Sequence, residues 1–361
     1  MKRAVKKEVL QVKPYVPGKP IDEVKRELGL RDVIKLASNE NPYGPSPKVL
    51  RAVMREARRL NRYPDGDCFY LRAALSQRLG IAGGQLIFGN GSDELIVQAV
   101  RALVDKGDEV VIAKPSFLIY DIAARIAGAK VRAVPLKDFR YDLNAMAKAV
   151  GRKTKIVFLG NPDNPSGKYL TEREVRGFLS KVRKDVLVFI DEAYFEYVEA
   201  DDYVDSIKLL KTRANVMVTR TFSKMYGLAG LRVGYGIASR EFAGILNRIR
   251  EPFNVNSVAQ AAALAALRDR AYYREIGRKI REQRQFLYRG LNNLNLDFVD
   301  SATNFVLVKV PGRASGIVRK LLKRGVIVRD MGFWGMNDYL RVTIGTAQEN
   351  KRFIQTLKET L

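Results

Sequence analysis

The sequence contains no histidine and a single cysteine in 361 residues. Without histidine, the chain cannot build a Ser-His-Asp or Cys-His nucleophile, nor the histidine-ligated sites of zinc, non-haem iron or haem. One cysteine, Cys68, provides neither a disulfide within the chain nor a cysteine-rich metal site. We therefore expect no metal site, and any catalysis must use lysine, tyrosine, carboxylates, hydroxyls, arginine or a cofactor.

Long apolar runs are also missing. No segment approaches the roughly 18 consecutive apolar residues of a membrane helix. The basic segment 1–18 lacks the apolar core of a secretory signal. Together with the single cysteine, these features predict a cytoplasmic protein. The apolar share of 47% is typical of a globular chain, and the length of 361 residues suggests two domains.

Acidic residues are outnumbered, with 39 Asp+Glu against 64 Lys+Arg and a formal net charge of +25. Such a charge fits binding to nucleic acid or to an anionic membrane, and it equally fits a solubilising surface. The excess is spread along the chain, and the cluster from Arg51 to Arg62 has helical spacing with apolar residues between. We therefore expect no specific nucleic-acid binding. A basic nucleic-acid-binding protein stays open only as the non-enzyme alternative.

The order of patterns along the chain is that of an α/β protein. Closely spaced prolines between residues 14 and 20 predict an N-terminal arm over residues 1–35. From about residue 85, short apolar strands alternate with amphipathic helices, which predicts a large domain over residues 36–255 with a mostly parallel sheet. Helices followed by mixed strands and helices predict a smaller α+β domain over residues 256–361.

Residues that carry chemistry follow the ends of the predicted strands. Asp191 ends the apolar run VLVFI, and Lys224 follows a strand inside the hydroxyl-rich turn TRTFSK. Residues 89–94 (GNGSDE) place small residues before a helix N-terminus, where an anion binds readily. Because ligands sit at the carboxyl ends of strands in such sheets, we expect these segments and residues 161–167 to form one site.

A buried carboxylate, a lysine and an anion cradle at one sheet edge suit pyridoxal phosphate. That cofactor needs a lysine to bind it covalently and an acidic partner for its pyridine nitrogen. It also brings its own electron sink, so no histidine is required. Each feature alone is explained as a helix cap or a surface charge, and only their joint occurrence at strand ends favours the cofactor.

Five segments resemble the histidinol-phosphate aminotransferases, a branch of the fold-type I, class II aminotransferases that use pyridoxal phosphate. The likeness runs from about Tyr15 to the C-terminus, and the spacing SK-x(7)-R-x-G-Y, with Lys224 and Arg232, is specific for the superfamily. It implies an α/β fold with a large, mostly parallel sheet domain and a smaller α+β C-terminal domain. The segments are IKLASNENPYGPSP, NPDNPSG, DEAYFEY, RTFSKMYGLAGLRVGY and LRVTIGT.

The resemblance implies a role for each matching residue around pyridoxal 5'-phosphate. Lys224 would bind the cofactor and move the proton, Asp191 would pair with the pyridine nitrogen, and Asn164 and Tyr194 would hydrogen-bond the phenolic oxygen. Lys224, Asp191 and Tyr194 would be the catalytic residues, with Phe117 stacked on the ring. The cofactor phosphate would be held by Gly91, Ser92, Thr221, Ser223 and Arg232, and by Tyr63 from the neighbouring subunit of a homodimer.

For substrate, the resemblance implies Tyr15, Asn164, Arg329 and Arg341. Paired arginines suit a dianionic phosphate and the carboxylates of glutamate, so both half-reactions would share one site. The family commonly has asparagine where this chain has Asp163, which bears on substrate preference. The implied reaction converts L-histidinol phosphate and 2-oxoglutarate to imidazole-acetol phosphate and L-glutamate in histidine biosynthesis. An aromatic amino-acid aminotransferase (phenylalanine or tyrosine) and a threonine-phosphate decarboxylase-like lyase stay open as alternatives.

Overall fold

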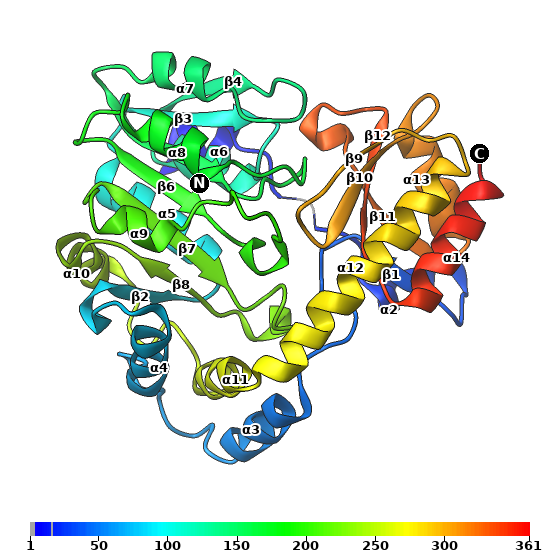
Figure 1. The fold of residues 1–361 in the computed structure, drawn as a ribbon, viewed down its shortest axis with the longest axis horizontal. Coiled ribbons are helices and arrows are strands. Elements are labelled where there is room, and N and C mark those ends of the chain that lie inside the picture. The colour runs from blue at the N-terminus through cyan, green and yellow to red at the C-terminus, as the bar shows by residue number, and fades with distance from the viewer. Residues whose placement is uncertain (1–3, 16) are drawn as a thin grey trace.

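The computed structural model describes residues 4–15 and 17–361, so residues 1–3 and 16 of the predicted arm lie outside the described part. The described chain forms two β-sheets, each with helices packed against it (Figure 1). The larger sheet has seven strands in the order β2-β8-β7-β6-β5-β3-β4, and the smaller has five in the order β1-β11-β12-β10-β9.

The larger sheet is mostly parallel, as predicted. Only β8 runs antiparallel to its neighbours, and the other adjacent pairs are parallel. Its central strands are buried except at Lys155 and read as nearly continuous apolar runs, which is typical of a sheet covered on both faces. The strands are β2 (Leu86–Gly89), β3 (Glu109–Lys114), β4 (Lys130–Pro135), β5 (Thr154–Gly160), β6 (Leu187–Asp191), β7 (Val216–Thr221) and β8 (Gly234–Ile237).

Helices cover both faces of this sheet, each group with its own apolar cluster. On one face α5 (Ser92–Leu103), α6 (Leu118–Ile126) and α10 (Arg240–Ile249) supply buried side chains. The other face is covered by α7 (Leu143–Ala149), α8 (Glu172–Leu179) and α9 (Ser206–Leu210). The carboxyl ends of the parallel strands stay uncovered by these helices, so they are available to a ligand.

The smaller sheet combines strands from both ends of the chain. Strand β1 pairs with β11 in parallel, and the remaining pairs are antiparallel. Its strands are β1 (Ile34–Leu36), β9 (Phe298–Val299), β10 (Phe305–Lys309), β11 (Val326–Asp330) and β12 (Tyr339–Thr343). Residues on both sides of the predicted boundary at residue 35 therefore belong to one strand. The domain boundaries as a whole stay predictions.

The remaining helices connect the two sheets. Helices α3 (Pro47–Ala57), α4 (Phe69–Leu79) and α11 (Ser257–Arg268) pack together below the larger sheet in Figure 1, and the long α12 (Arg270–Asn292) runs from there to the smaller sheet. One apolar cluster holds residues of α4, α11, α12 and β12 together. The others are α1 (Lys7–Gln11), α2 (Ile21–Leu28), α13 (Ala314–Lys323) and α14 (Ala347–Lys358), with short 3-10 turns η2 (Gly83–Gln85), η3 (Phe195–Tyr197), η4 (Ala229–Leu231) and η5 (Gly332–Trp334).

Within residues 4–15 and 17–361, no helix has both the length and the apolar character needed to cross a membrane.

Candidate functional site

A cavity of about 280 Å³ lies at the carboxyl ends of β5, β6 and β7 and is lined on its other side by residues of the smaller sheet. The cavity brings together most of the residues that the sequence singled out. Those that line it are Tyr15, Ser92, Phe117, Asn164, Asp191, Tyr194, Thr221, Ser223, Lys224, Arg232, Arg329 and Arg341. Gly91 adjoins it through Arg232, whereas Tyr63 lies outside it.

Asp191, at the end of β6, forms the floor of the cavity and is almost fully buried. Its Oδ2 accepts a hydrogen bond of 2.8 Å from the Tyr120 hydroxyl, and its Oδ1 accepts one of 3.3 Å from the Thr219 hydroxyl. Burial raises the pKa of Asp191 to about 6, and the two hydroxyl donors act in the opposite direction. The carboxylate is therefore held in place by groups that favour its charged form.

The sequence analysis missed Tyr120. Its ring stacks on Phe158 at 4.6 Å with an interplanar angle of 4°, so the direction of its hydroxyl is fixed by packing. It also meets Phe117 edge-on at 5.5 Å. The signal was available, because Tyr120 follows Phe117 by three residues at the start of α6 and thus points to the same side.

A buried ion pair fixes the strand ends from behind. Arg220 Nε lies 2.8 Å from Glu192 Oε2, and the Arg220 guanidinium carbon lies 3.6 Å from the centre of the Phe195 ring. Both side chains are buried, and they directly adjoin Asp191 and Thr221 in sequence. The pair joins the ends of β6 and β7 and so helps to hold the floor of the cavity.

Lys224 projects into the same cavity from the turn after β7. Its Nζ donates a hydrogen bond of 3.1 Å to the carbonyl oxygen of Ser38 and lies 5.7 Å from the centre of the Tyr194 ring. Burial, reinforced by the positive charge of Arg341, lowers the pKa of Lys224 to about 8. A larger share of this amine is therefore neutral near pH 7 than for an exposed lysine.

Three consecutive residues after β1 contact three residues of the cavity. The carbonyl oxygen of Ala37 accepts from Arg341, that of Ser38 accepts from Lys224, and Asn39 Nδ2 donates to the Tyr194 hydroxyl at 2.9 Å. Burial raises the pKa of Tyr194 to about 12, so its hydroxyl keeps the proton at neutral pH.

Asn39 was also missed. It adopts left-handed backbone with φ of 56°, which asparagine tolerates better than most residues. Its backbone N–H donates to Thr343 Oγ1 at 2.9 Å, which ties the segment to β12.

The turn before α5 forms a pocket for an anion. Gly91 has φ of 86°, and a Cβ there would lie 2.3 Å from Arg232 Nη2, so only glycine fits. Arg232 Nη1 donates to Ser223 Oγ at 3.3 Å, and its Nη2 lies 3.7 Å from Asp93 Oδ2. Backbone donors at the start of α5, the hydroxyls of Thr221 and Ser223 and the guanidinium of Arg232 thus lie beside one another.

The two arginines of the smaller sheet lie opposite each other. Arg329 of β11 and Arg341 of β12 are directly paired across antiparallel strands. Like charges in such positions repel, unless an anion lies between or beside them. The arrangement produces a strongly positive wall on this side of the cavity.

Arg341 is buried and lacks a carboxylate partner among the described residues. Its Nη1 donates to Asn164 Oδ1, and its Nη2 donates to the carbonyl oxygen of Ala37 at 3.1 Å. In the described part of the chain its buried Nε has no hydrogen-bond partner. A buried guanidinium with an open donor is a good site for a ligand carboxylate or phosphate.

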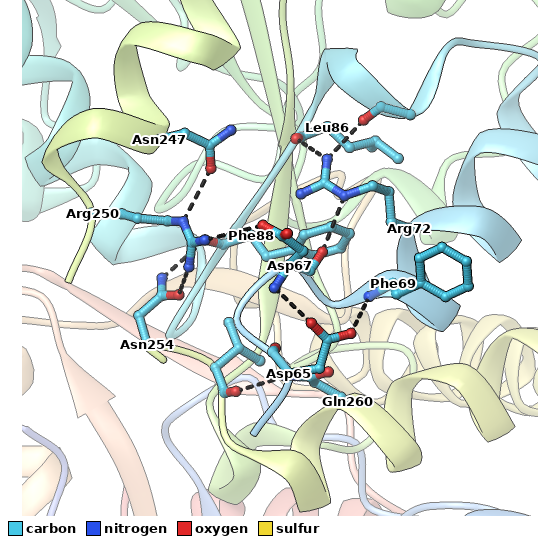
Figure 2. A network of polar contacts seen from close by, with 12 residues as sticks. Asp65, Asp67, Phe69, Arg72, Leu86, Phe88, Asn247, Arg250, Asn254 and Gln260 are labelled. Carbon is cyan, nitrogen blue, oxygen red and sulfur yellow. Dashed lines mark hydrogen bonds and ion pairs between the residues drawn. The ribbon is translucent and has the colours of Figure 1, made fainter. Parts of the chain in front are cut away.

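Tyr63 is 83% exposed and stacks on Phe253 with ring centres 4.8 Å apart. The segment that follows it is held by a polar network (Figure 2). Asp65 accepts from the backbone N–H groups of Asp67 and Phe69 at 2.9 and 2.7 Å. The loop carrying Tyr63 is therefore anchored, and its ring does not line the cavity.

Two arginines extend the network to other elements (Figure 2). Arg72 of α4 donates to the carbonyl oxygens of Gly83 and Leu86, each at 2.7 Å. Arg250, in the segment after α10, donates to Asp67 just before α4 at 3.5 Å. The start of α4, strand β2 and the segment after α10 are thereby joined into one support.

The described residues contain no group of histidine, cysteine or acidic side chains arranged to hold a metal ion.

Comparisons with known proteins agree with this architecture. The family model described as aminotransferase class I and II matches residues 31–357. A histidinol-phosphate aminotransferase of Moorella thermoacetica is 48% identical over 354 residues, covering 98% of this chain and 92% of that protein. Histidinol-phosphate aminotransferase 2 of Carboxydothermus hydrogenoformans is 47% identical, covering 99% of each. The crystal structure of the Sinorhizobium meliloti histidinol-phosphate aminotransferase in complex with pyridoxal-5'-phosphate superposes with a TM-score of 0.92 at 32% identity, covering 99% of this chain and 97% of that one.

Proposed function

The chain belongs to the class I and II aminotransferase family, and we propose that it transfers the amino group of L-histidinol phosphate to 2-oxoglutarate. The products are imidazole-acetol phosphate and L-glutamate, which makes the reaction a step of histidine biosynthesis. The observation that carries the proposal is the cross-strand pair Arg329 and Arg341, which faces a cavity that also contains Lys224 and Asp191. Relatives 47% and 48% identical bear the same activity in their names.

Pyridoxal 5'-phosphate fits the residues of the cavity. Arg232 reaches the start of α5 only because Gly91 has no Cβ, which places a guanidinium where a phosphate would lie, and the buried Asp191 would gain a cationic partner. When bound, the cofactor supplies a carbonyl carbon that accepts the amino group and a ring that withdraws electrons. The residues that would hold it are Gly91, Ser92, Phe117, Asn164, Asp191, Tyr194, Thr221, Ser223, Lys224 and Arg232.

At the floor of the cavity, Asp191 would accept a hydrogen bond from the protonated pyridine nitrogen of the cofactor. The hydroxyls of Tyr120 and Thr219 already bond one oxygen each, so the carboxylate is oriented before any ligand arrives. A fixed negative charge at this point favours positive charge on the nitrogen beside it.

Lys224 would move the proton of the substrate. Because its pKa is lowered to about 8, its Nζ accepts and returns a proton near neutral pH at little cost. Tyr194 retains its own proton and serves as a hydrogen-bond donor, which separates the duties of the two side chains.

Arg329 and Arg341 would bind the phosphate of histidinol phosphate and the carboxylates of 2-oxoglutarate in turn, with Tyr15 and Asn164 beside them. Both ligands carry two negative charges near neutral pH. One positively charged wall therefore serves both half-reactions.

We further propose that the active unit is a cytoplasmic homodimer in which Tyr63 reaches the cofactor phosphate of the other subunit. Support comes from exposed apolar side chains around Tyr63, which a monomer would leave in water. They lie on α3, the loop after it and the start of α4, and comprise Leu50, Met54, Leu60, Phe69 and Tyr70.

The substrate assignment is tested by comparing amino donors. Enzyme loaded with pyridoxal phosphate is assayed for glutamate formation from 2-oxoglutarate with histidinol phosphate, phenylalanine or tyrosine. We expect kcat/KM for histidinol phosphate to exceed that for the aromatic amino acids by about 100-fold or more. A preference for the aromatic amino acids would identify the aromatic aminotransferase, and carbon dioxide release from threonine phosphate would identify the lyase.

The subunit assignment is tested by mixing two inactive variants. Tyr63→Ala and Lys224→Ala subunits, unfolded and refolded together, form hybrid dimers with one site that contains both native residues. Activity restored in the mixture supports the donation of Tyr63 across the interface. A mixture no more active than its components, or a monomer in sedimentation, contradicts it.

A further inference from the structure

We propose that Trp334 is a specificity-determining residue that positions Arg329 for substrates ending in a phosphate monoester. The inference rests on the proposed function and adds a residue that neither the motifs nor the family likeness singled out. Trp334 lies in the turn η5 after β11, and it is the only tryptophan in the chain.

The ring of Trp334 lies against the guanidinium of Arg329. The guanidinium carbon is 4.9 Å from the centre of the indole ring and 5.7 Å from that of Tyr15. Two aromatic rings thus limit where Arg329 can point, whereas Arg341 is held by carbonyl and amide oxygens. Cation–π contacts restrict the group without neutralising its charge, so an anion can still bind it.

Trp334 is itself tied to the larger sheet. Its indole N–H donates a hydrogen bond of 3.0 Å to the carbonyl oxygen of Ser116, and only 7% of the residue is exposed. Ser116 directly precedes Phe117, which lines the cavity. The same indole therefore connects the anion-binding wall to the side of the cavity that would hold the cofactor ring.

Hydrogen bonds continue from this point towards Arg341. The Ser116 hydroxyl lies 3.1 Å from the Tyr141 hydroxyl, which donates to Asp163 at 2.8 Å. Asp163 adjoins Asn164, the residue that accepts from Arg341. A chain of contacts through loops at the edge of the larger sheet thus links the supports of the two arginines.

Trp334 and Phe117 also separate two cavities. Both residues line the candidate site, and both line a second cavity of about 630 Å³ on its other side. Shortening Trp334 would join the two spaces and let Arg329 move away from Arg341. A ligand with a doubly charged phosphate would lose more affinity than other ligands, because it contacts both arginines at once.

The test compares histidinol phosphate with L-histidinol, which differs only by the phosphate. For Trp334→Ala we expect the ratio of the two kcat/KM values to fall about tenfold, chiefly through KM for the phosphorylated donor. Trp334→Phe keeps an aromatic ring but lacks the N–H, so its ratio of kcat/KM values should lie between those of Trp334→Ala and the wild type. Phe333→Ala, a change of the exposed neighbour in the same turn, serves as the matched control and should leave the ratio unchanged.

A second readout does not depend on turnover. Because Trp334 is the only tryptophan, its fluorescence reports this contact directly. Inorganic phosphate added to the loaded enzyme should change the emission, potassium chloride at equal ionic strength should not, and Arg329→Met should abolish the response. An unchanged emission with phosphate, or a Trp334→Ala variant that loses both donors equally, overturns the proposal. Absence of activity on histidinol phosphate in the wild type would instead refute the proposed function, while the fluorescence test would still apply.

Discussion

The side of the cavity formed by the larger sheet holds its charged groups differently from the side formed by the smaller sheet. Asp191 and Lys224 lie at strand ends, and burial shifts both towards their neutral forms, with pKa values of about 6 and about 8. Arg329 and Arg341 lie opposite each other on paired strands and stay fully charged. The lowered pKa of Lys224 suits proton transfer, the hydroxyl donors on Asp191 favour its charged form beside the cofactor, and the permanent charges of the arginines suit binding. Changes on the first side should therefore lower kcat, and changes on the second should raise KM.

The largest expected effect comes from removing Lys224. Lys224→Ala should lower kcat by about 10⁴-fold or more, because proton transfer and attachment of the cofactor both depend on its amine. The visible absorbance of the bound cofactor should change with it, while thermal unfolding of the cofactor-free protein stays within a few degrees of wild type. A variant that keeps even a hundredth of the activity would break the assignment of proton transfer to this side.

Removing Arg341 should have the next largest effect and should appear in KM. Arg341→Met is expected to raise KM for both histidinol phosphate and 2-oxoglutarate by about 10²-fold, since both ligands lose a buried charged partner. Steady-state kinetics with each ligand varied in turn measures this. If kcat fell and KM did not change, the division between the two sides would be wrong.

Tyr120→Phe tests the support of the larger-sheet side alone. It removes the donor to Asp191 Oδ2 and keeps the ring that stacks on Phe158, so packing is preserved. We expect kcat to fall about tenfold with KM little changed, because one hydrogen bond to a charged group is lost. The absorbance of the bound cofactor should become more dependent on pH, since the charge of Asp191 is then less well maintained. If the pH dependence of the cofactor absorbance were unaltered, the hydroxyl of Thr219 alone would be enough to keep Asp191 charged.

The smallest effect probes how the two sides interact. The rate at which cofactor-free enzyme takes up pyridoxal phosphate should rise with pH up to about 8 and then level off, because the neutral Lys224 amine is the reactive form. With an ordinary lysine, the rate of uptake would continue to rise past pH 10. Arg341→Met removes a positive charge that lowers this pKa, so the plateau for the variant should begin at higher pH. Stopped-flow absorbance measures both curves, and identical plateaus would mean that the sides act independently.

The difference between the two sides also explains what the sequence could predict. The mostly parallel sheet and the residues at its strand ends follow from local patterns, because each apolar run ends in its own polar turn. Arg329 and Arg341 came only from the family likeness, since nothing local distinguishes them in a chain with 64 Lys+Arg. Asn39 and Trp334 act through contacts with distant segments, and no spacing along the chain records those.

Three elements carry little signal in the sequence, each for a physical reason. Strand β4 is an edge strand with mostly exposed residues, so it lacks the apolar run of its neighbours. Strand β1 is three residues long and gains its partner, β11, from the far end of the chain. Helix α4 buries only Leu71 and Leu75, and its other apolar residues do not form one stripe. The domain boundaries and the roles of the individual site residues stay predictions.

The segment after β1 has a consequence for how the protein matures. Ala37, Ser38 and Asn39 reach partners between 155 and 304 residues further along the chain. Contacts at such separation form late, because a long loop must close before they gain anything. During synthesis, the strand ends of the larger sheet can form while β12 is still being made, but the three contacts cannot all exist until it has emerged. The pair of arginines that would bind the substrate is then completed only at the end of translation, after all the residues that would hold the cofactor have been made.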